Sequence, residues 1–367
     1  MTLARVIIAG GGTGGHIYPG VALAEEIRRR NPAAVVTFIG TSRGLEGTIL
    51  PPLGHPLALV DASRLKGGSV WQKLAGLFRL PRAIWQSWRL IGALRPDVVI
   101  GVGGYASGPA LLAAWLRRER TAIQEQNAAP GLTNRWLGRL VRRVFVGFEG
   151  AVARFPSSKV TFTGNPLRHA LTERLASPAT RSATDATTLR VLVFGGSQGA
   201  RFLNERVPAS LAAMRAAAPH LRLVITHQTG RADEAATRTR YADLGLAATV
   251  TPFIHDMPAA YATTDLAICR AGALTLAELT AVGLPALLVP FPHAADNHQE
   301  ANARDLADAG AALLVTQAAW ADATVADTLA SLVADPARLT AMRAAARARG
   351  RLDAAARITD ALEELAA

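Results

Sequence analysis

Short apolar segments alternate with longer helical patterns along the whole chain, and this alternation restricts the possible folds more than any other feature of the sequence. In the first half the apolar segments are residues 6–9, 35–39, 98–102, 122–124 and 144–146. In the second half they are residues 189–194, 221–226, 249–253, 266–268, 286–289 and 312–315. Parallel strands covered on both faces are almost continuously hydrophobic, and strand–helix alternation is typical of βαβ units. The sequence therefore predicts an α/β protein with two doubly wound, Rossmann-like domains.

Turn-forming residues place a boundary between the two series. The tripeptide Gly164-Asn165-Pro166 follows the last strand of the first series, and residues 176–188 are rich in Ser, Thr, Ala and Pro. Because 367 residues suit two domains of ordinary size, we expect an N-terminal domain of residues 1–164 and a C-terminal domain of residues 165–340. Residues 341–367 are rich in Ala and Arg, and we expect them to form a closing helix that packs back on the N-terminal domain.

Positive charge is concentrated in the first of these domains. Residues 1–165 carry 21 Lys and Arg against 8 Asp and Glu, whereas residues 166–367 carry 19 against 20. The asymmetry predicts an anionic partner for the first domain: a membrane surface, a nucleic acid or a phosphorylated substrate.

The cysteine content and the uncharged stretches argue against a disulfide-bonded, secreted or membrane-spanning protein. Cys269 is the single cysteine, which argues against a disulfide framework and against a cysteine-built zinc site. No apolar signal core precedes the first strand, and the longest uncharged stretch, residues 98–116, is broken by glycines and Pro109. We therefore expect a cytoplasmic protein without a membrane span.

A glycine-rich loop follows the first strand of each series, at the position where doubly wound domains bind their ligands. The first loop reads Gly10-Gly-Gly-Thr13-Gly14-Gly15-His16, and the second reads Gly195-Gly-Ser197-Gln198-Gly-Ala200. Glycines let backbone N–H groups approach phosphate oxygens, and the N-terminus of the helix that follows favours an anion. One such loop is equally typical of a tight strand-to-helix turn, but the pair indicates a ligand held between the two domains.

The first loop also matches the dinucleotide fingerprint G-x-G-x-x-G at Gly10, Gly12 and Gly15. An NAD-binding domain is expected to end its second strand with an acidic residue that binds the ribose hydroxyls. Here that strand ends with Phe38-Ile-Gly-Thr41. The sequence therefore argues against NAD, and we expect no cofactor.

Further motifs follow the predicted strands in a fixed order. They read His16-Ile-Tyr-Pro-Gly20, Gly103-Gly104-Tyr105-Ala-Ser-Gly-Pro109, Glu125-Gln-Asn127, Gly131-Leu-Thr-Asn134, Gly164-Asn-Pro-Leu-Arg168, Arg270-Ala-Gly-Ala-Leu-Thr-Leu-Ala-Glu278 and Pro292-His-Ala-Ala-Asp-Asn-His-Gln299. Together with the two loops, this set resembles the MurG family, the peptidoglycan N-acetylglucosaminyltransferases of glycosyltransferase family 28, over essentially the whole chain. The resemblance implies a GT-B fold, in which two Rossmann-like domains face each other across a cleft. It also implies that N-acetylglucosamine is transferred with inversion from UDP-GlcNAc to the C4 hydroxyl of the muramyl sugar of lipid I, which gives lipid II.

The resemblance assigns one group of residues to UDP-GlcNAc binding: Thr13, Gly14, Gly15, Asn127, Arg168, Ser197, Gln198, Ile254, Ala273, Leu274, Thr275, Glu278 and Gln299. Several of these residue types suit the chemistry. A helix that begins at Ala273 can bind a nucleotide phosphate at its N-terminus. Glu278, about one turn further on, can accept two hydrogen bonds from vicinal ribose hydroxyls. Arg168 supplies a fixed positive charge for a departing diphosphate.

Metal chemistry has weaker support in the sequence. No Asp-x-Asp pair occurs, so we expect Arg168 and helix N-termini to neutralise the leaving group. His293 and His298 lack a third ligand at metal-binding spacing, and we expect them to hydrogen bond and pack.

Attack by a sugar hydroxyl requires a general base within hydrogen-bond reach. The candidates on the acceptor side are His16 and Glu125, and Gly104, Tyr105 and Asn134 are expected beside them. A histidine titrates near neutrality and is the better-matched base. The alternative for His16 is a histidine at the start of a helix that orients the loop.

A basic and aromatic segment lies between Asp61 and Asp97. It contains no acidic residue but seven basic ones: Arg64, Lys66, Lys73, Arg79, Arg82, Arg89 and Arg95. Trp71, Trp85 and Trp88 follow helical spacing among them, a composition typical of helices at the headgroup boundary of anionic membranes. The implied acceptor, lipid I, is anchored in the cytoplasmic leaflet, so we expect a peripheral protein on the cytoplasmic face of the inner membrane. The alternative is an ordinary helix packed on the sheet; no nucleic-acid motif accompanies the charges.

Two other functions remain open at this point. A UDP-GlcNAc epimerase shares the nucleotide-sugar site but requires neither a membrane face nor the Gly103-Gly104-Tyr105 loop. A non-enzymatic protein of this composition would be a nucleotide-sugar sensor or a nucleic-acid binder.

Overall fold

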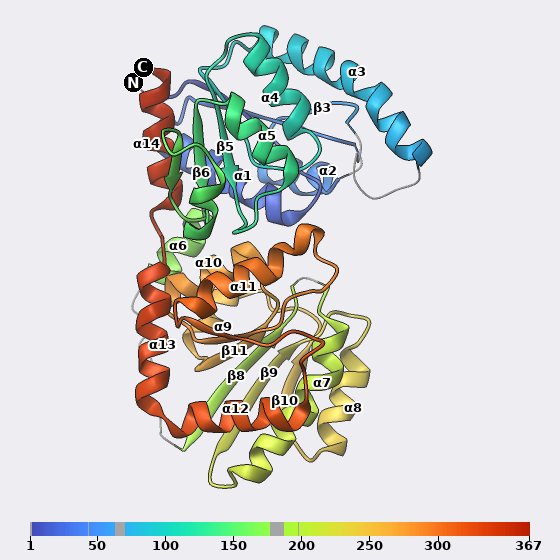
Figure 1. Ribbon diagram of the computed structural model, residues 1–367, viewed down its shortest axis with the longest axis vertical. Helices are drawn as coiled ribbons and strands as arrows, with labels where there is room; N and C mark the ends of the chain where they lie inside the picture. The colour runs from blue at the N-terminus through green and yellow to red at the C-terminus, as the bar shows by residue number, and fades with distance from the viewer. Residues whose placement is uncertain (1, 43, 63–69, 177–186, 197) are drawn as a thin grey trace. The chain divides into compact units, whose positions relative to one another are not determined.

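The computed structural model describes residues 2–42, 44–62, 70–176, 187–196 and 198–367, with the backbone alone for residues 70–79 and 176. The chain divides into two compact units. Unit 1 comprises Met1–Thr172 and Arg351–Ala367, and unit 2 comprises Glu173–Gly350. Each unit contains one parallel β-sheet flanked by helices (Figure 1). The predicted fold class, two Rossmann-like doubly wound α/β domains, is confirmed.

Unit 1 is built on a seven-stranded parallel sheet with the order β3-β2-β1-β4-β5-β6-β7. Its strands are β1 (Arg5–Ala9), β2 (Val35–Gly40), β3 (Leu57–Leu59), β4 (Val98–Gly101), β5 (Thr121–Glu125), β6 (Arg143–Val146) and β7 (Val160–Phe162). The reversal of strand order between β1 and β4 places the loops that follow these two strands side by side at one edge of the sheet.

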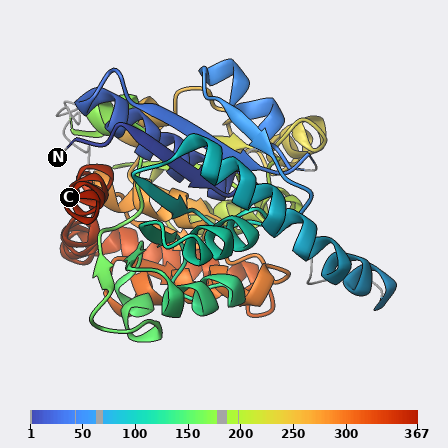
Figure 2. The same ribbon diagram turned by 90° about the horizontal axis from the view of Figure 1, so that it is seen from above.

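The helices of unit 1 cover the two faces of this sheet. They are α1 (Gly14–Arg30), α2 (Glu46–Ile49), α3 (Val70–Leu94), α4 (Ser107–Leu116), α5 (Leu132–Leu140) and α14 (Ala354–Ala366), with 3-10 helices at Pro51–Leu53 and Glu149–Arg154. Alternate residues of β1 explain the two layers. Val6 and Ile8 pack in one cluster with α1 and α14, whereas Ile7 and Ala9 pack in another with α4. Figure 2 shows α3 extending beyond the other elements of this unit.

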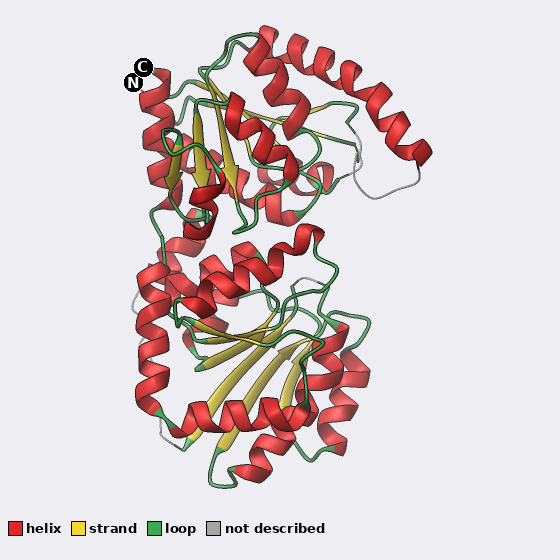
Figure 3. Ribbon diagram, in the orientation of Figure 1, coloured by secondary structure: helices red, strands yellow, loops and turns green. Residues whose placement is uncertain are grey.

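Unit 2 is built on a six-stranded parallel sheet with the order β10-β9-β8-β11-β12-β13 (Figure 3). Its strands are β8 (Thr188–Phe194), β9 (Arg222–Gln228), β10 (Ala248–Thr251), β11 (Leu266–Cys269), β12 (Ala286–Leu288) and β13 (Ala312–Leu314). Its helices are α7 (Arg201–Ala217), α8 (Glu234–Asp243), α9 (Met257–Ala262), α10 (Ala273–Val282), α11 (His298–Asp308), α12 (Asp322–Ala334) and α13 (Pro336–Arg349), with a 3-10 helix at Ala295–Asn297. Helix α6 (His169–Ala176) connects the two units along the chain.

The C-terminal segment, residues 341–367, comprises the end of α13 and the whole of α14. Helix α13 ends at Gly350, where an added Cβ atom would lie 2.7 Å from the Thr280 carbonyl oxygen, and it packs on α10 in unit 2. Helix α14 packs on α1 in unit 1, and Ile358 and Leu362 lie in that unit's core. This segment therefore forms two helices, one in each unit, and the extended backbone of Gly350 (φ −63°, ψ 138°) ends α13.

Candidate functional site

The first glycine loop is seated against the loop that follows β4. The Gly11 N–H donates to the Gly103 carbonyl oxygen at 3.1 Å, and the Gly10 N–H donates to the Ile39 carbonyl oxygen at 3.0 Å. Gly104 has a φ of +84°, and a Cβ atom added to it would lie 2.1 Å from the Gly11 carbonyl oxygen. Only glycine permits both this conformation and this approach. The first glycine loop and the loop that follows β4 therefore form one surface.

Helix α1 begins directly in the first loop. Thr13 is its N-cap residue, and the N–H groups of His16 and Ile17 both donate to the Thr13 carbonyl oxygen. Gly14 and Gly15 are the first two residues of the helix, so their N–H groups precede the intrahelical hydrogen bonds. This is the arrangement in which a helix N-terminus binds an anion.

His16 lies where the first glycine loop meets the loop that follows β4. Its side chain is half-buried, and its Nδ1 atom is 3.4 Å from the Thr13 hydroxyl. A Cβ atom added to Gly103 would lie 3.0 Å from His16 Nε2, so the imidazole edge occupies the space left by that glycine. The Tyr105 ring lies against Gly12 of the opposite loop. The structure thus brings together His16, Gly104 and Tyr105.

Glu125 ends β5 as a buried carboxylate that is 2% exposed. Its Oε1 accepts from the backbone N–H of Asn127 at 2.9 Å and from the Asn127 side chain at 3.3 Å. Its Oε2 accepts from Asn134 Nδ2 at 2.9 Å and from the Gly131 N–H at 3.3 Å. Burial raises the pKa of Glu125, and these hydrogen bonds oppose the rise. Both carboxylate oxygens are therefore bonded to the segment that leads into α5.

A chain of buried amides beside Glu125 was not predicted as part of the site. Gln124 Nε2 donates to Asn165 Oδ1, Asn165 Nδ2 donates to the Gln126 carbonyl oxygen, and Gln126 Nε2 donates to the Val102 carbonyl oxygen, each at 2.9 Å. The chain links the ends of β4 and β5 to the segment after β7. The signal in the sequence was Gly164-Asn165-Pro166, from which we predicted a domain boundary and a family motif but no role for Asn165 in the site.

Glu46 is a second residue that the sequence analysis missed. It is buried, and its Oε1 accepts from the Thr41 N–H at 3.1 Å. A Cβ atom added to Gly11 would lie 2.0 Å from the same oxygen, so Glu46 lies directly behind the first glycine loop. A glutamate six residues after the strand that ends at Gly40 was the available signal, but an isolated glutamate does not predict burial.

Arg168 lies in unit 1, shortly before α6, and its side chain is exposed. The guanidinium carbon is 5.2 Å from the centre of the Tyr18 ring. Tyr18 belongs to the first turns of α1, so this cation–π contact holds the Arg168 charge near the start of that helix.

Four of the candidate nucleotide residues of unit 2 lie on α10. Ala273, Leu274 and Thr275 form its first turn, and the first intrahelical bond runs from the Leu276 N–H to the Gly272 carbonyl oxygen at 3.0 Å. Glu278 follows on the same helix, and its Oε2 accepts from the Tyr261 hydroxyl at 2.7 Å. The helix therefore offers an anion-binding N-terminus and a carboxylate one turn away.

The second glycine loop is held by the end of β9. Gln228 Nε2 donates to the Gly196 carbonyl oxygen at 2.7 Å. Gly199 has a φ of +72°, and an added Cβ atom would lie 1.8 Å from the Thr229 carbonyl oxygen. Gln198 is exposed on this loop, whereas Ser197 lies outside the described residues. Gln228 was not predicted, because an amide at a strand end carries no distinctive spacing.

Three further residues of the predicted motifs and site lie in unit 2: Ile254, Arg270 and Gln299. Gln299 Oε1 accepts a hydrogen bond from the Phe291 N–H at 3.0 Å. This bond uses the oxygen of the side-chain amide and not its NH2 group. Ile254 is half-buried in the connection between β10 and α9. Arg270 is buried and donates to the Val289 and Pro290 carbonyl oxygens, so it ties the loop after β12 to the end of β11.

Among the described residues no group of three His, Cys, Asp or Glu side chains is placed to hold a metal ion. His298 Nδ1 is 2.6 Å from the Ala295 carbonyl oxygen, and the His293 ring packs edge-on against Phe291.

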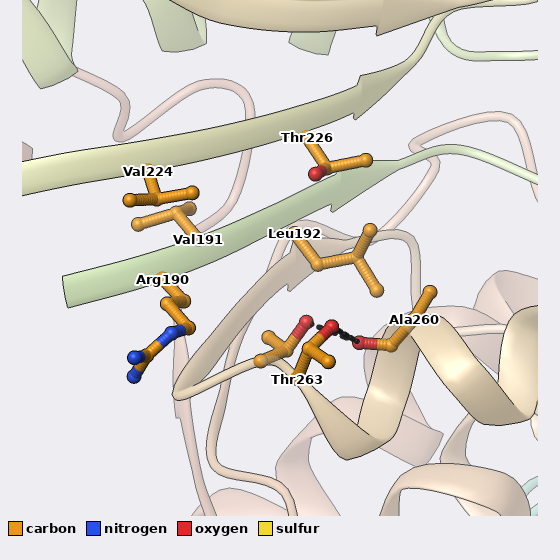
Figure 4. Close-up of a pocket in the computed structure, with 8 residues that line it drawn as sticks. Arg190, Val191, Leu192, Val224, Thr226, Ala260 and Thr263 are labelled. Carbon is orange, nitrogen blue, oxygen red and sulfur yellow. Dashed lines mark hydrogen bonds between the residues drawn. The ribbon is translucent and has the colours of Figure 1, made fainter. Parts of the chain in front are cut away.

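A separate pocket of about 200 Å³ lies in unit 2 between β8, β9 and α9 (Figure 4). Its lining includes Arg190, Leu192, Val224, Thr226 and Thr263, and Thr263 Oγ1 bonds to the Ala260 carbonyl oxygen. None of the candidate site residues lines it, so it does not belong to the predicted site.

Two family models match the chain. The glycosyltransferase family 28 N-terminal domain matches residues 6–146, and the glycosyltransferase family 28 C-terminal domain matches residues 190–358. Together these matches cover most of both units.

Curated relatives match over almost the full length. A protein of Myxococcus xanthus named UDP-N-acetylglucosamine–N-acetylmuramyl-(pentapeptide) pyrophosphoryl-undecaprenol N-acetylglucosamine transferase is 48% identical over 361 residues, which are 98% of this chain and 93% of the relative. A protein of Syntrophus aciditrophicus with the same name is 46% identical, with 97% of each chain covered.

Solved structures give the same picture at the level of the fold. The crystal structure of Acinetobacter baumannii MurG superposes with a TM-score of 0.83 at 33% identity, covering 98% of this chain and 99% of that one. A UDP-GlcNAc 2-epimerase from Neisseria meningitidis superposes with a TM-score of 0.66 at 16% identity, covering 98% and 100%. At that identity the epimerase shares the fold alone.

Proposed function

The chain belongs to glycosyltransferase family 28, and from that membership we propose that it makes lipid II. It transfers N-acetylglucosamine from UDP-GlcNAc to the C4 hydroxyl of the muramyl sugar of lipid I. The observation that carries this function is the 48% identity to a transferase of that name over 98% of the chain. An epimerase of the same fold is the weaker alternative, because the solved epimerases are similar at only 14–16% identity.

In this proposal unit 2 binds the donor nucleotide. The N-terminus of α10 at Ala273, Leu274 and Thr275 receives a phosphate, and Glu278 accepts hydrogen bonds from the ribose. Gln299 donates to the donor sugar through its amide group, since its Oε1 is occupied by the Phe291 N–H. Ile254 contacts the base, and Gln198 and Ser197 of the second glycine loop supply further donors.

Unit 1 binds the acceptor and performs the proton transfer. His16 removes the proton from the C4 hydroxyl as its oxygen attacks the anomeric carbon of the donor sugar, and the bond from that carbon to the diphosphate breaks with inversion. Arg168 and the α1 N-terminus at Thr13, Gly14 and Gly15 stabilise the negative charge on the departing UDP. Tyr105 and Gly104 contact the acceptor beside His16.

Glu125 has a different role in this proposal. Its two oxygens accept hydrogen bonds from Asn127, Gly131 and Asn134, so a substrate proton would have to compete with bonds already made. Glu125 therefore fixes the loop that presents Asn127, and His16 is the base.

A membrane-binding surface is the finer part of the proposal. Helix α3 buries Ala83, Ser87 and Ile91 but exposes Trp85 and Trp88, so it packs one face on the unit and presents tryptophans on another. Exposed tryptophans also lie on α4 (Trp115) and α5 (Trp136, 61% exposed), and α4 packs against both α3 and α5.

Three exposed tryptophans of this surface each lie against a guanidinium. Arg89 lies 5.0 Å from the Trp85 ring centre, Arg117 lies 4.9 Å from Trp88, and Arg139 lies 5.1 Å from Trp136. Exposed aromatic rings with cationic partners suit the headgroup region of anionic lipids. No helix within the described residues has the length and apolarity to cross a bilayer. Because the proposed acceptor, lipid I, is anchored in the cytoplasmic leaflet, we infer that this surface binds peripherally to the cytoplasmic face of the inner membrane.

The decisive experiment incubates the protein with labelled UDP-GlcNAc and a lipid I analogue. Transfer predicts a labelled disaccharide on the lipid and release of UDP. Formation of a free epimer without lipid product would support the epimerase, and binding without turnover would support a nucleotide-sugar sensor.

A further inference from the structure

Tyr261 places a buried phenol directly against the proposed ribose ligand. Its side chain is 3% exposed, and its hydroxyl donates to Glu278 Oε2 at 2.7 Å. The Phe194 ring packs against the Tyr261 ring with centroids 6.2 Å apart. Helix α9, which carries Tyr261, packs on α10, which carries Glu278. The hydroxyl is therefore held in one place by the surrounding protein.

The direction of this hydrogen bond is fixed. Burial raises the pKa of Tyr261 well above its ordinary value, and the neighbouring Glu278 charge raises it further. The phenol keeps its proton and can only donate to the carboxylate. A hydroxyl bonded to a carboxylate forms a charge-assisted hydrogen bond, which is stronger than one between neutral groups.

The bond holds Glu278 Oε2 in one position relative to the buried Tyr261 ring. Glutamate loses considerable side-chain entropy when it is immobilised, and a ligand that immobilises it on binding must offset that loss. A carboxylate that is already oriented binds more tightly to the one arrangement of hydroxyls that it fits. The two vicinal hydroxyls of a ribose form such an arrangement, and a deoxyribose lacks one of them.

We propose that Tyr261 is a positioning residue that orients Glu278 for the ribose and thereby sets the preference of unit 2 for ribonucleotides over deoxyribonucleotides. The inference rests on the proposed role of Glu278 in donor binding. Tyr261 does not need to touch the nucleotide, because it acts through the carboxylate.

The test compares the affinities of UDP and 2′-deoxy-UDP by isothermal titration calorimetry. The proteins are the wild type, Tyr261→Phe, Glu278→Gln and the double variant. Tyr241→Phe is the matched control, because Tyr241 is also buried in unit 2 and its hydroxyl bonds to His227 Nδ1 at 3.0 Å. Both tyrosine variants remove one buried hydroxyl and keep the ring, so thermal unfolding reveals any shared loss of stability.

We expect the wild type to bind UDP about 10–100-fold more tightly than 2′-deoxy-UDP, since a hydrogen bond to a charged group has that effect. Tyr261→Phe should reduce this preference by about 3–10-fold, with KM for UDP-GlcNAc raised and kcat nearly unchanged. Tyr241→Phe should leave the preference as in the wild type. In the double variant, the Tyr261 change should add nothing to Glu278→Gln, because the two residues act as one unit.

The outcomes separate this inference from the proposed function beneath it. If Glu278→Gln leaves the preference intact, Glu278 does not bind the ribose and the donor assignment itself is wrong. If Glu278→Gln abolishes the preference but Tyr261→Phe matches Tyr241→Phe, the positioning role of Tyr261 is overturned while the donor assignment stands.

Discussion

At the scale of single residues, His16 and Glu125 differ in how their proton-accepting atoms are held. His16 Nδ1 lies 3.4 Å from the Thr13 hydroxyl, and the imidazole lies between the first glycine loop and the loop that follows β4. We predict that His16→Ala lowers kcat by about 10²–10⁴-fold, because a positioned general base contributes a factor of that size. Steady-state kinetics with a lipid I analogue measures the effect, and calorimetry with UDP should show nearly unchanged donor affinity.

Glu125 supplies the comparison for that experiment. Glu125→Gln keeps the shape of the side chain but replaces an oxygen acceptor with a donor that faces other donors. We expect the variant to lose about 1–3 kcal/mol of stability in urea unfolding, the cost of an unsatisfied buried polar group. A Glu125→Gln protein that unfolds like the wild type but has a kcat as low as that of His16→Ala would transfer the role of base to Glu125.

His227 gives the protein a pH-dependent stability. It is fully buried in unit 2, where Nδ1 lies 3.0 Å from the Tyr241 hydroxyl and Nε2 lies 3.1 Å from Asn204 Oδ1. Burial lowers the pKa of His227 to about 3. Below pH about 6.5 the unfolded chain binds a proton at this residue that the native state does not bind, so stability falls as the pH falls from that value toward 3.

The expected size follows from the same linkage. Stability should fall by about 1.4 kcal/mol per pH unit below pH about 6 from this residue alone. Urea unfolding at pH 7.5 and 5.0 measures the fall, and His227→Gln should reduce it because glutamine does not titrate. An equal fall in both proteins would show that other groups account for the acid sensitivity.

At the scale of elements, hydrophobic pattern predicted the strands that are buried on both sides. All six strands of unit 2 and five of the seven in unit 1 coincide with the predicted apolar segments. The two that were missed, β3 and β7, are three-residue strands at the edges of their sheet. Neither β3 nor β7 has a fully buried residue, whereas β13, an edge strand of the same length that was predicted, buries Ala312.

In the candidate site, residues required by the local backbone conformation were predicted, whereas residues defined by contacts between distant segments were not. Glycine loops are visible in the sequence because a φ near +84° at Gly104 and the close approach at Gly199 demand glycine locally. Glu46, Gln126 and Tyr261 acquire their partners only when separate segments come together in the folded unit. Their residue types are common, so no local pattern distinguishes them from surface or core residues.

Helix α3 carries a prediction about the membrane. Binding to vesicles that contain phosphatidylglycerol should weaken steeply with added salt, because each basic residue near an anionic surface contributes about 1 kcal/mol and salt screens it. Replacing Arg79, Arg82 and Arg89 with Gln should remove the salt-sensitive part. Replacing Trp85, which is 56% exposed, and Trp88 with Ser should remove the part that persists at high salt.

The control for this experiment lies in the other unit. Leu244 is exposed at the end of α8, and Leu244→Ser should bind vesicles like the wild type. All variants should keep the same affinity for UDP. Unchanged vesicle binding in both α3 variants would show that the exposed tryptophans of this helix serve another contact.

At the scale of the whole molecule, the chain closes unit 1 with its last helix. After unit 2 is complete at Gly350, α14 returns to pack on α1, and Arg30 bonds to Asp360, Glu363 and the Ala356 carbonyl oxygen. Unit 1 is therefore assembled from two segments that unit 2 separates in the sequence, and its core includes Ile358 and Leu362 from the second segment.

This topology predicts that a substitution in the core of one unit destabilises that unit and not the other. Leu362 on α14 and Leu329 on α12 are both fully buried, the first in the core of unit 1 and the second in that of unit 2. Replacing either with Ala should cost about 2–5 kcal/mol, the usual effect of removing a buried leucine side chain. Amide hydrogen exchange should show that Leu362→Ala lowers protection in α1 and β1 but leaves α7 and β8 unchanged, whereas Leu329→Ala does the reverse. Loss of protection in both units from either variant would mean that the two units unfold as one.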